Sequence, residues 1–258
     1  MVRRILGSIV REIIGRRIIL PLFLASGTEA SSLINTILKV RGLSQTYLEI
    51  GIENGLTLEA VKARSKTGVD PNPKVFSSLL TPRTAIDVLE SDKFFQNNRK
   101  KFDFIYIDGL HTFEQALRDL LHSIDNLVPK GVILLDDTVP SDKWSALPDQ
   151  QDAYRARQHE NKSDDTSWHG DVFRVVTLVS SWNIDFLHFA TVTDLQNPKT
   201  LFWIDSGHSW KEVIEGASMN KHANRSFEQE FSHGIPEHFR PLSKLDLIDQ
   251  LSVQSRNK

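Results

Sequence analysis

The chain has 258 residues, of which 40% are hydrophobic and 25% are charged, and its formal net charge is −2. This length suits one large α/β domain or two small ones. The small net charge gives no basic footprint for nucleic acid, so nucleic acid is not expected as a partner. The absence of cysteine excludes disulfides, thiolate metal sites and a cysteine nucleophile. A metal would need carboxylate, histidine or backbone ligands, which favours hard cations such as Mg²⁺.

Two helices are expected within residues 1–43, where they would pack on the core or on a partner chain. Apolar residues recur at helical spacing over residues 2–17, with arginines around them. Such a basic amphipathic helix can pack on its own domain, form a homodimer surface or bind peripherally to an anionic membrane. The longest apolar run, residues 18–25, is too short to cross a bilayer, so no transmembrane segment is predicted. The second helix is expected over residues 29–40.

Residues 44–206 alternate between apolar strands and helical patterns, which predicts an α/β core. The alternation is typical of a three-layer, doubly wound, mostly parallel seven-stranded sheet with an antiparallel C-terminal hairpin, the Rossmann-like arrangement. The expected strands cover residues 46–50, 67–69, 84–89, 102–107, 132–135, 184–192 and 200–204. A DLQNP turn separates the last two strands and makes them the hairpin.

The helix after the fourth strand carries a clear start signal. Thr112 is followed three residues later by Gln115, which predicts a capping box. Residues 141–167 are different, because they are polar, lack a clear period and are too long for an ordinary connection. They indicate either a lid over a site or a segment without regular structure. Residues 207–258 form a polar tail, with short helices expected over 227–231 and 243–251.

The first strand of the core leads into a loop, GIENG, that contains two glycines. A tight turn of this kind lets the backbone approach a bound ligand closely. The motif is Glu49-x-Gly51-x-x-x-Gly55, so the central glycine of a dinucleotide fingerprint is missing, and Glu53 takes its place. A carboxylate here repels phosphates but not a ligand with a sulfonium and an amino group. The loop therefore disfavours a nicotinamide oxidoreductase and favours S-adenosylmethionine.

Acidic residues follow three of the expected strands. Asp70 comes about 20 residues after the first glycine motif, where an acidic side chain can bind ribose hydroxyls, although a residue before proline can also merely begin a turn. Asp108 follows a later strand, and Asp136 and Asp137 follow the next. The carboxyl ends of parallel strands form the ligand site in an open α/β sheet, so these carboxylates mark a candidate site. Asp137 can instead cap the turn that follows it.

Six motifs occur in order between residues 47 and 207, namely YLEIGIENG, GVDPNP, SDKFF, FIYIDGLHTFEQALRDL, GVILLDDT and WHGDVFRVV. Together they resemble the class I S-adenosylmethionine-dependent methyltransferases, in particular a bacterial group often found beside sugar and polysaccharide genes. The resemblance implies that Glu49, Gly51 and Gly55 line the methionine part, Thr57 binds its carboxylate, Asp70 holds the ribose, Ser91 and Asp92 lie near the adenine, and Asp108 lies below the reacting methyl. Ser91 and Asp92 can equally be only a helix cap.

The E-x-G-x-x-x-G spacing is also similar to that of catechol-type and macrocin-type O-methyltransferases, which are metal-dependent. This resemblance implies that Asp108, Asp136 and Asp137 hold a divalent cation, which would lower the pKa of an acceptor hydroxyl. Many members of the resembled bacterial group have His-Asp where this chain has Asp136-Asp137, so metal use is left open. His111 can serve as a general base, as a further ligand or as an ordinary surface residue.

The WHGD motif supplies the remaining candidates, because Trp168, His169 and Asp171 follow the long polar segment and can border an acceptor pocket. Asp171 can equally cap the next helix. The sequence predicts a cytoplasmic S-adenosylmethionine-dependent O-methyltransferase for a small or carbohydrate-like hydroxyl acceptor, assisted by Mg²⁺. Two alternatives are a metal-free methyltransferase for another acceptor and a non-catalytic nucleotide-binding module that recruits partners through its basic N-terminal helix. The acceptor and the oligomeric state are left open.

Overall fold

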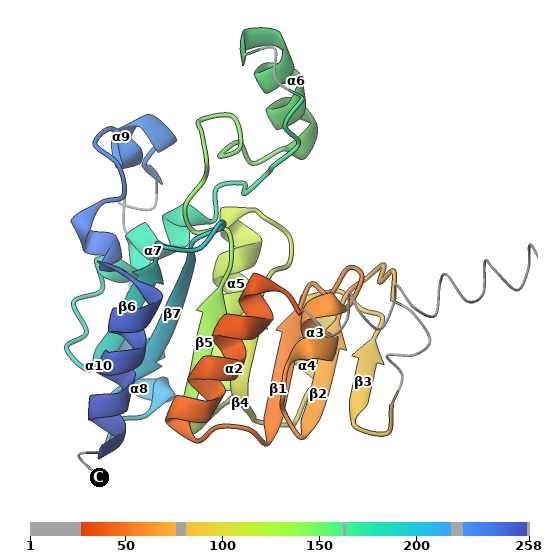
Figure 1. Ribbon diagram of the computed structural model, residues 1–258, viewed down its shortest axis with the longest axis vertical. Helices are drawn as coiled ribbons and strands as arrows, with labels where there is room; N and C mark the ends of the chain where they lie inside the picture. Colours follow the sequence, from red (N-terminus) through yellow and green to blue (C-terminus); the bar gives the residue numbers. More distant parts are fainter. Residues whose placement is uncertain (1–26, 76–80, 162–163, 218–223, 257–258) are drawn as a thin grey trace, which may run out of the picture.

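The fold is built around an eight-stranded sheet in the computed structural model, which describes residues 27–75, 81–161, 164–217 and 224–256 (Figure 1). The strand order is β3-β2-β1-β4-β5-β7-β6-β8. The strands are β1 (Thr46–Ile50), β2 (Ser65–Val69), β3 (Thr84–Asp87), β4 (Phe102–Ile107), β5 (Leu127–Leu135), β6 (Leu187–Val192), β7 (Lys199–Ile204) and β8 (Pro241–Leu242). The first five are parallel, β7 runs antiparallel between β5 and β6, and β8 adds in parallel to β6.

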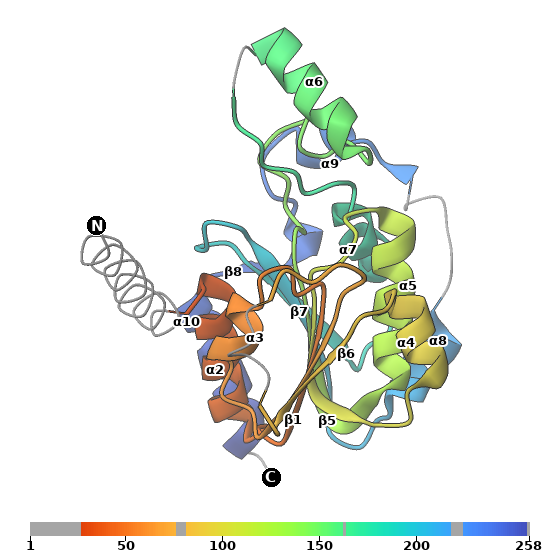
Figure 2. The same ribbon diagram turned by 90° about the vertical axis from the view of Figure 1, so that its right-hand side faces the viewer.

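Helices cover both faces of this sheet, which gives the three layers (Figure 2). One face carries α2 (Glu29–Arg41), α3 (Leu56–Ala60) and α10 (Lys244–Arg256), and the other carries α4 (Ser91–Asn97), α5 (Phe113–Asp125), α7 (Phe173–Ser180) and α8 (Trp210–Gly216). Strand side chains alternate between the two layers. In β4, Phe104 and Tyr106 join the core under α2 and α10, whereas Ile105 and Ile107 join the core under α5. The doubly wound architecture predicted from the sequence is confirmed.

The sheet differs from the prediction in its outer parts. β1 and β4 have the predicted bounds, β2 begins two residues earlier, and β3 ends two residues earlier. β5 begins at Leu127 rather than at residue 132, because its first residues already pair with the start of β4. The eighth strand was not predicted, since Pro241–Leu242 is too short to show any alternation. The antiparallel pairing of β6 with β7 is confirmed.

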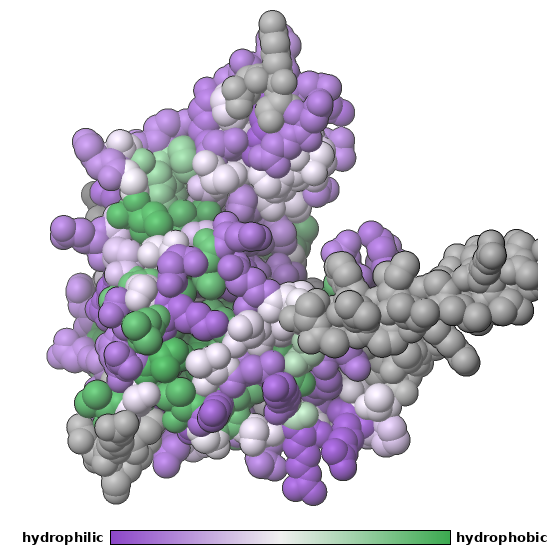
Figure 3. Space-filling view, viewed as in Figure 1, coloured by the Kyte–Doolittle hydropathy of each residue, from purple (hydrophilic) through white to green (hydrophobic). Residues whose placement is uncertain are grey.

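A helix that the sequence did not predict, α6 (Gln150–Asn161), lies within the long polar segment at the C-terminal ends of the parallel strands. Hydrophilic residues cover most of the face of α6 that the space-filling view shows (Figure 3). Its anchor is Arg157, whose side chain is 1% exposed. The guanidinium donates to the Asp142 carboxylate at 3.1 and 3.0 Å and to the carbonyls of Asp165 and Ser167 at 2.7 and 2.8 Å. A buried cation therefore ties α6 to the rest of its segment, beside the buried Ala153.

The predicted capping box at the start of α5 is wrong. Thr112 is the N-cap, but its side chain makes no capping bond. The amide of Phe113 donates instead to the Asp171 carboxylate at 2.7 Å. Gln115 turns away and donates to Ser91. The N-terminus of α5 is thus capped by a residue that lies far along the chain, which local spacing cannot reveal.

At the chain ends, Thr28 is the N-cap of α2, and α9 (Phe227–Phe231) has the predicted bounds. α8, the short η3 (Glu237–Phe239) and β8 were not predicted within the tail. The predicted amphipathic helix over residues 2–17 lies outside the described residues, and so does any homodimer or membrane contact made through it. Among the described helices, none combines the length and the hydropathy needed to span a bilayer.

Candidate functional site

A cavity of about 870 Å³ opens at the C-terminal ends of the parallel strands. Pockets for small molecules and cofactors in proteins usually measure roughly 300–1,000 Å³. Its walls include every residue predicted from the sequence to bind a cofactor except Gly55, namely Glu49, Gly51, Thr57, Asp70, Ser91, Asp92 and Asp108. His111 and Trp168 also line it. The fold therefore brings the predicted cofactor residues to one place.

The glycine loop has the backbone geometry that its sequence suggested. Gly51 has a φ of 79°, and a Cβ atom on it would lie 1.8 Å from the carbonyl oxygen of Asp108. Only glycine allows β1 to end so close to the end of β4. Gly55, with a φ of 76°, is the N-cap of α3 and turns the chain into that helix. Glu53 also has positive φ, at 40°, and its side chain is 72% exposed at the cavity edge.

Asp70 fixes the glycine loop to the end of β2. Its Oδ2 accepts hydrogen bonds from the amides of Ile52 and Glu53, both at 3.0 Å, and its Oδ1 accepts one from the amide of Asn72 at 2.7 Å. Asp70 is therefore both a wall residue of the cavity and the anchor of the loop above it. Asp70 can therefore both begin the turn and face a ligand, so its two predicted roles are compatible in this geometry.

Glu49 is a buried carboxylate in the cavity wall, only 2% exposed. The hydroxyl of Tyr47 donates to its Oε2 at 2.6 Å. Burial raises the pKa of Glu49 to about 8, although the Tyr47 hydrogen bond opposes the shift. A buried carboxylate of this kind is stabilised as the anion when a cationic group binds next to it.

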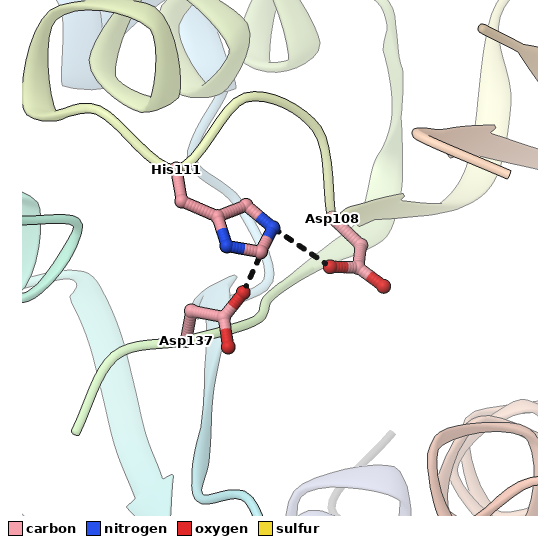
Figure 4. A group of neighbouring side chains, drawn as sticks. All are labelled: Asp108, His111 and Asp137. Atoms are coloured by element: carbon pink, nitrogen blue, oxygen red, sulfur yellow. Dashed lines mark ion pairs between the residues drawn. The ribbon is translucent and has the colours of Figure 1, made fainter. Parts of the chain in front are cut away.

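Three chemically active side chains meet beside this cavity (Figure 4). Nε2 of His111 lies 3.1 Å from Oδ2 of Asp137 and 3.7 Å from Oδ1 of Asp108. One ligand atom from each residue lies within 4.8 Å of the others. Nδ1 of His111 is 2.9 Å from the carbonyl oxygen of Trp168, and the imidazole stacks on the Trp168 indole. A carbonyl only accepts, so Nδ1 carries a proton and Nε2 is the atom that faces the carboxylates.

Asp136, which was predicted as the third acidic ligand, does not join this group. Lys199 binds its Oδ1 at 2.5 Å, and Asn197 donates to the same oxygen at 3.0 Å. The hydroxyl of Tyr106 donates to its other oxygen. His111 takes the third position instead. The sequence analysis missed Lys199 and Asn197, because they lie on the β6–β7 hairpin about 60 residues away and carry no motif.

The charges in this group shift its pKa values. Burial alone would lower the pKa of His111, but the hydrogen bond with Asp108 and the charges of Asp137 and Asp108 raise it to about 9. Burial, together with the charge of Asp136, raises the pKa of Asp108 to about 6 and that of Asp137 to about 8. The group therefore retains protons near neutral pH that a bound cation would displace.

The three predicted acceptor-site residues lie in different surroundings. Trp168 lines the cavity, and its indole N–H donates to the carbonyl of Leu147 at 2.7 Å. His169 is buried outside the cavity lining, and burial lowers its pKa. Asp171 is also buried, where it caps α5 and pairs with Arg174 at 2.6 Å. Gln150 at the start of α6 also lines the cavity and was missed because its segment has no pattern.

Residues 48–138 match the family model described as a methyltransferase domain. No curated protein matches the chain. Among solved structures, the fold is similar to an O-methyltransferase from Bacillus cereus in complex with SAH, at 14% identity and a TM-score of 0.50, over 77% of this chain and 91% of that one. A putative O-methyltransferase from Klebsiella pneumoniae gives 12% identity and a TM-score of 0.47 over 70% and 81% of the two chains. At 14% identity the likeness to the Bacillus cereus enzyme concerns the fold alone.

Proposed function

We propose that this chain, whose residues 48–138 carry a methyltransferase domain on a class I fold, transfers the methyl group of S-adenosylmethionine to a hydroxyl group of a small or carbohydrate-like acceptor. One observation carries the proposal. The cavity wall contains the predicted cofactor residues, and at Asp108 and His111 it adjoins a carboxylate–histidine group. A methyl donor and an acceptor oxygen would thus be held side by side, which is what an in-line displacement needs.

The cofactor is assigned along the cavity wall from its methionine end to its adenine end. Glu49 would face the cationic amino group, Thr57 the carboxylate and Asp70 the ribose, with Ser91 and Asp92 near the adenine. Gly51 and Gly55 would let the backbone approach the ligand. Glu53 at the cavity edge opposes a pyrophosphate, which argues against a dinucleotide. A buried carboxylate such as Glu49 also suits a cationic ligand better than a neutral one.

A divalent cation such as Mg²⁺ fits the group formed by Asp108, His111 and Asp137. Two carboxylates and one imidazole nitrogen are an ordinary donor set, and the Trp168 carbonyl orients the ring as a carbonyl behind a metal-bound histidine does. Oδ1 of Asn197 is buried beside the group and has no hydrogen-bond partner within the described chain. When bound, such a cation would lower the pKa of an acceptor hydroxyl. Asp136 would not bind the cation itself. It would hold Asn197 and Lys199 in place next to the site, through the hydrogen bonds that it accepts from them.

His111 decides between this proposal and a metal-free enzyme in which it accepts the acceptor's proton. The neighbouring carboxylates raise its pKa to about 9, which favours the protonated imidazole over a free base. A protonated imidazole cannot act as a general base. A cation that displaces this proton makes Nε2 a ligand, so we favour the metal-assisted reaction. We also propose a cytoplasmic location, because a chain without cysteine suits a reducing compartment.

The test is calorimetry on the full chain with SAH, S-adenosylmethionine and NAD, followed by a transfer assay. We expect binding of the first two ligands and none of NAD. Transfer to a panel of hydroxyl acceptors should require Mg²⁺ or Mn²⁺ and stop with EDTA. No affinity for SAH would remove the proposal as a whole. Transfer that survives EDTA would remove only the metal, and binding without transfer to any acceptor would favour the non-catalytic module.

A further inference from the structure

Arg157 is a buried cation that does not line the cavity. It lies on α6, beyond the C-terminal ends of the parallel strands (Figures 1 and 2). Its side chain is 1% exposed, whereas the side chain of Arg155 on the same helix is 77% exposed and pairs with Asp152 on the surface. A guanidinium is buried at a cost in hydration unless its N–H groups find acceptors. The acceptors of Arg157 therefore indicate what it is buried to hold.

The guanidinium joins the two stretches of chain that flank α6. Before the helix, Nε and Nη2 donate to the two carboxylate oxygens of Asp142 at 3.1 and 3.0 Å. After the helix, Nη1 donates to the carbonyls of Asp165 and Ser167 at 2.7 and 2.8 Å. Burial would raise the pKa of Asp142, but the hydrogen bonds from Arg157 and Ser145 lower it, so the pair is charged at neutral pH. All three nitrogens are engaged, which the single nitrogen of a lysine cannot reproduce.

Trp168 lies between the residues that this junction fixes. On its N-terminal side, the carbonyl of Ser167 accepts from the guanidinium. On its C-terminal side, the amide of His169 donates to the carbonyl of Ser145 at 3.0 Å. The amide of Ser145 in turn donates to the Asp142 carboxylate at 2.6 Å. The backbone on both sides of Trp168 is thus tied to the guanidinium, directly on one side and through Asp142 on the other.

Trp168 in turn holds His111. Nδ1 of His111 donates to the Trp168 carbonyl at 2.9 Å, and the two rings stack with their centroids 4.9 Å apart. Nε2 of the same imidazole faces Asp137 at 3.1 Å and Asp108 at 3.7 Å (Figure 4). A continuous series of hydrogen bonds and one ring stack therefore leads from Arg157 to the carboxylate–histidine group.

We propose that Arg157 is a positioning residue for His111, which it orients by fixing Trp168. The inference rests on the proposed function, because His111 belongs to the group assigned there to the divalent cation. With Nδ1 held by the carbonyl, the imidazole presents Nε2 to the two carboxylates. An imidazole without such a partner can turn about its bond to Cβ and lose this orientation. Arg157 itself contacts none of the three residues of the group.

The first readout is the Nδ1 proton of His111, observed by NMR in the ¹⁵N-labelled full chain without metal or cofactor and assigned by its absence in His111→Gln. In the wild-type chain its hydrogen bond to the Trp168 carbonyl should make it exchange slowly with water. Arg157→Gln should accelerate this exchange at least about 10-fold, because the hydrogen bond is no longer held in place. Arg155→Gln, on the same helix, is the matched control and should leave the exchange unchanged.

The second readout is Mn²⁺ affinity, measured by calorimetry on the same chains. Arg157→Gln should weaken Mn²⁺ binding by about 10–100-fold, as the loss of a residue that orients a metal-bound histidine does. Arg155→Gln should stay within about 2-fold of wild type. If Arg157→Gln does not fold, Arg157→Lys takes its place with the same expected direction, because it keeps the charge but cannot bond both flanking stretches at once.

Each other result overturns the inference. If either readout is unchanged in Arg157→Gln while urea unfolding shows a less stable chain, Arg157 only stabilises α6. A wild-type chain whose His111 Nδ1 proton exchanges freely also overturns it, and this measurement needs no variant to fold. The proposed function fails separately, through absence of SAH binding to the wild-type chain. If the wild-type chain binds no Mn²⁺, the metal part of that proposal fails, and the proton readout alone decides whether Arg157 orients His111.

Discussion

The two halves of the site are held together in different ways. In the cofactor half, neighbours in sequence or on the adjacent strand hold the polar groups: Tyr47 binds Glu49, and the amides of the glycine loop bind Asp70. In the acidic half, Lys199 on β7 fixes Asp136, and the carbonyl of Trp168 orients His111. The cofactor half is thus formed by local backbone geometry. The acidic half exists only when distant parts of the chain have closed over it.

The largest expected effect comes from Lys199, because it links β7 to Asp136. Both side chains are buried, at 5% and 7% exposure, and their charges compensate each other. Lys199→Met should lower the free energy of unfolding by about 3–5 kcal/mol, since it leaves a buried carboxylate unpaired. The double variant Lys199→Met with Asp136→Asn should recover most of the loss. Urea unfolding measures both.

The matched control for this experiment is Lys143, which pairs with Glu160 at 2.8 Å on the surface, with both side chains about half exposed. Lys143→Met should destabilise the chain far less than Lys199→Met, because an exposed pair is screened by water. If Lys199→Met and Lys143→Met destabilise the chain equally, the acidic half does not depend on closure by β7. The same conclusion follows if the double variant is no more stable than the single one.

The second prediction separates the two halves by ligand. Asp137→Asn should weaken Mn²⁺ binding and slow methyl transfer by at least about 100-fold, since loss of even an outer partner of a metal site costs roughly 10–100-fold. SAH affinity should stay within about 2-fold of wild type, because interactions between independent sites are small. Asp137 lies outside the cavity lining, whereas Asp108 lies within it. Calorimetry with Mn²⁺ and with SAH measures both affinities.

Asp70→Asn tests the cofactor half, as Asp137→Asn tests the acidic half. It replaces a charged acceptor of three backbone amides and should weaken SAH binding by about 10-fold. Mn²⁺ affinity should not change, because no contact joins Asp70 to the acidic group. A loss of affinity for both ligands in either variant would mean that the two halves are coupled.

The same contrast explains what the sequence could predict. Strand ends, the glycine spacing and Asp70 are features of contiguous segments, and the structure places them in one cavity. The replacement of Asp136 by His111 in the acidic group depends on Lys199, and the cap of α5 depends on Asp171. Neither partner is visible in any local pattern. A helix such as α6, which a buried arginine ties to its segment, is hidden for the same reason.

Glu49 in the cofactor half should make the stability of the chain depend on pH. Its pKa is raised to about 8 in the folded chain, mainly by burial. Between its ordinary pKa of about 4.5 and pH 8, the unfolded chain releases this proton while the folded chain keeps it. The free energy of unfolding should therefore fall as pH rises through this window, by up to about 1.4 kcal/mol per pH unit, and level off above it.

Urea unfolding from pH 5 to pH 9 of the wild-type chain and of Glu49→Gln isolates this contribution, since the acidic half is present in both. The stability of the glutamine variant relative to wild type should rise with pH up to about 8. Saturating SAH should reduce the difference, because its amino cation would stabilise the Glu49 anion in the folded chain. Parallel pH profiles without SAH would show that Glu49 ionises normally. If SAH leaves this difference in stability unchanged, its amino cation does not bind next to Glu49. The cofactor would then lie in the cavity in the opposite orientation.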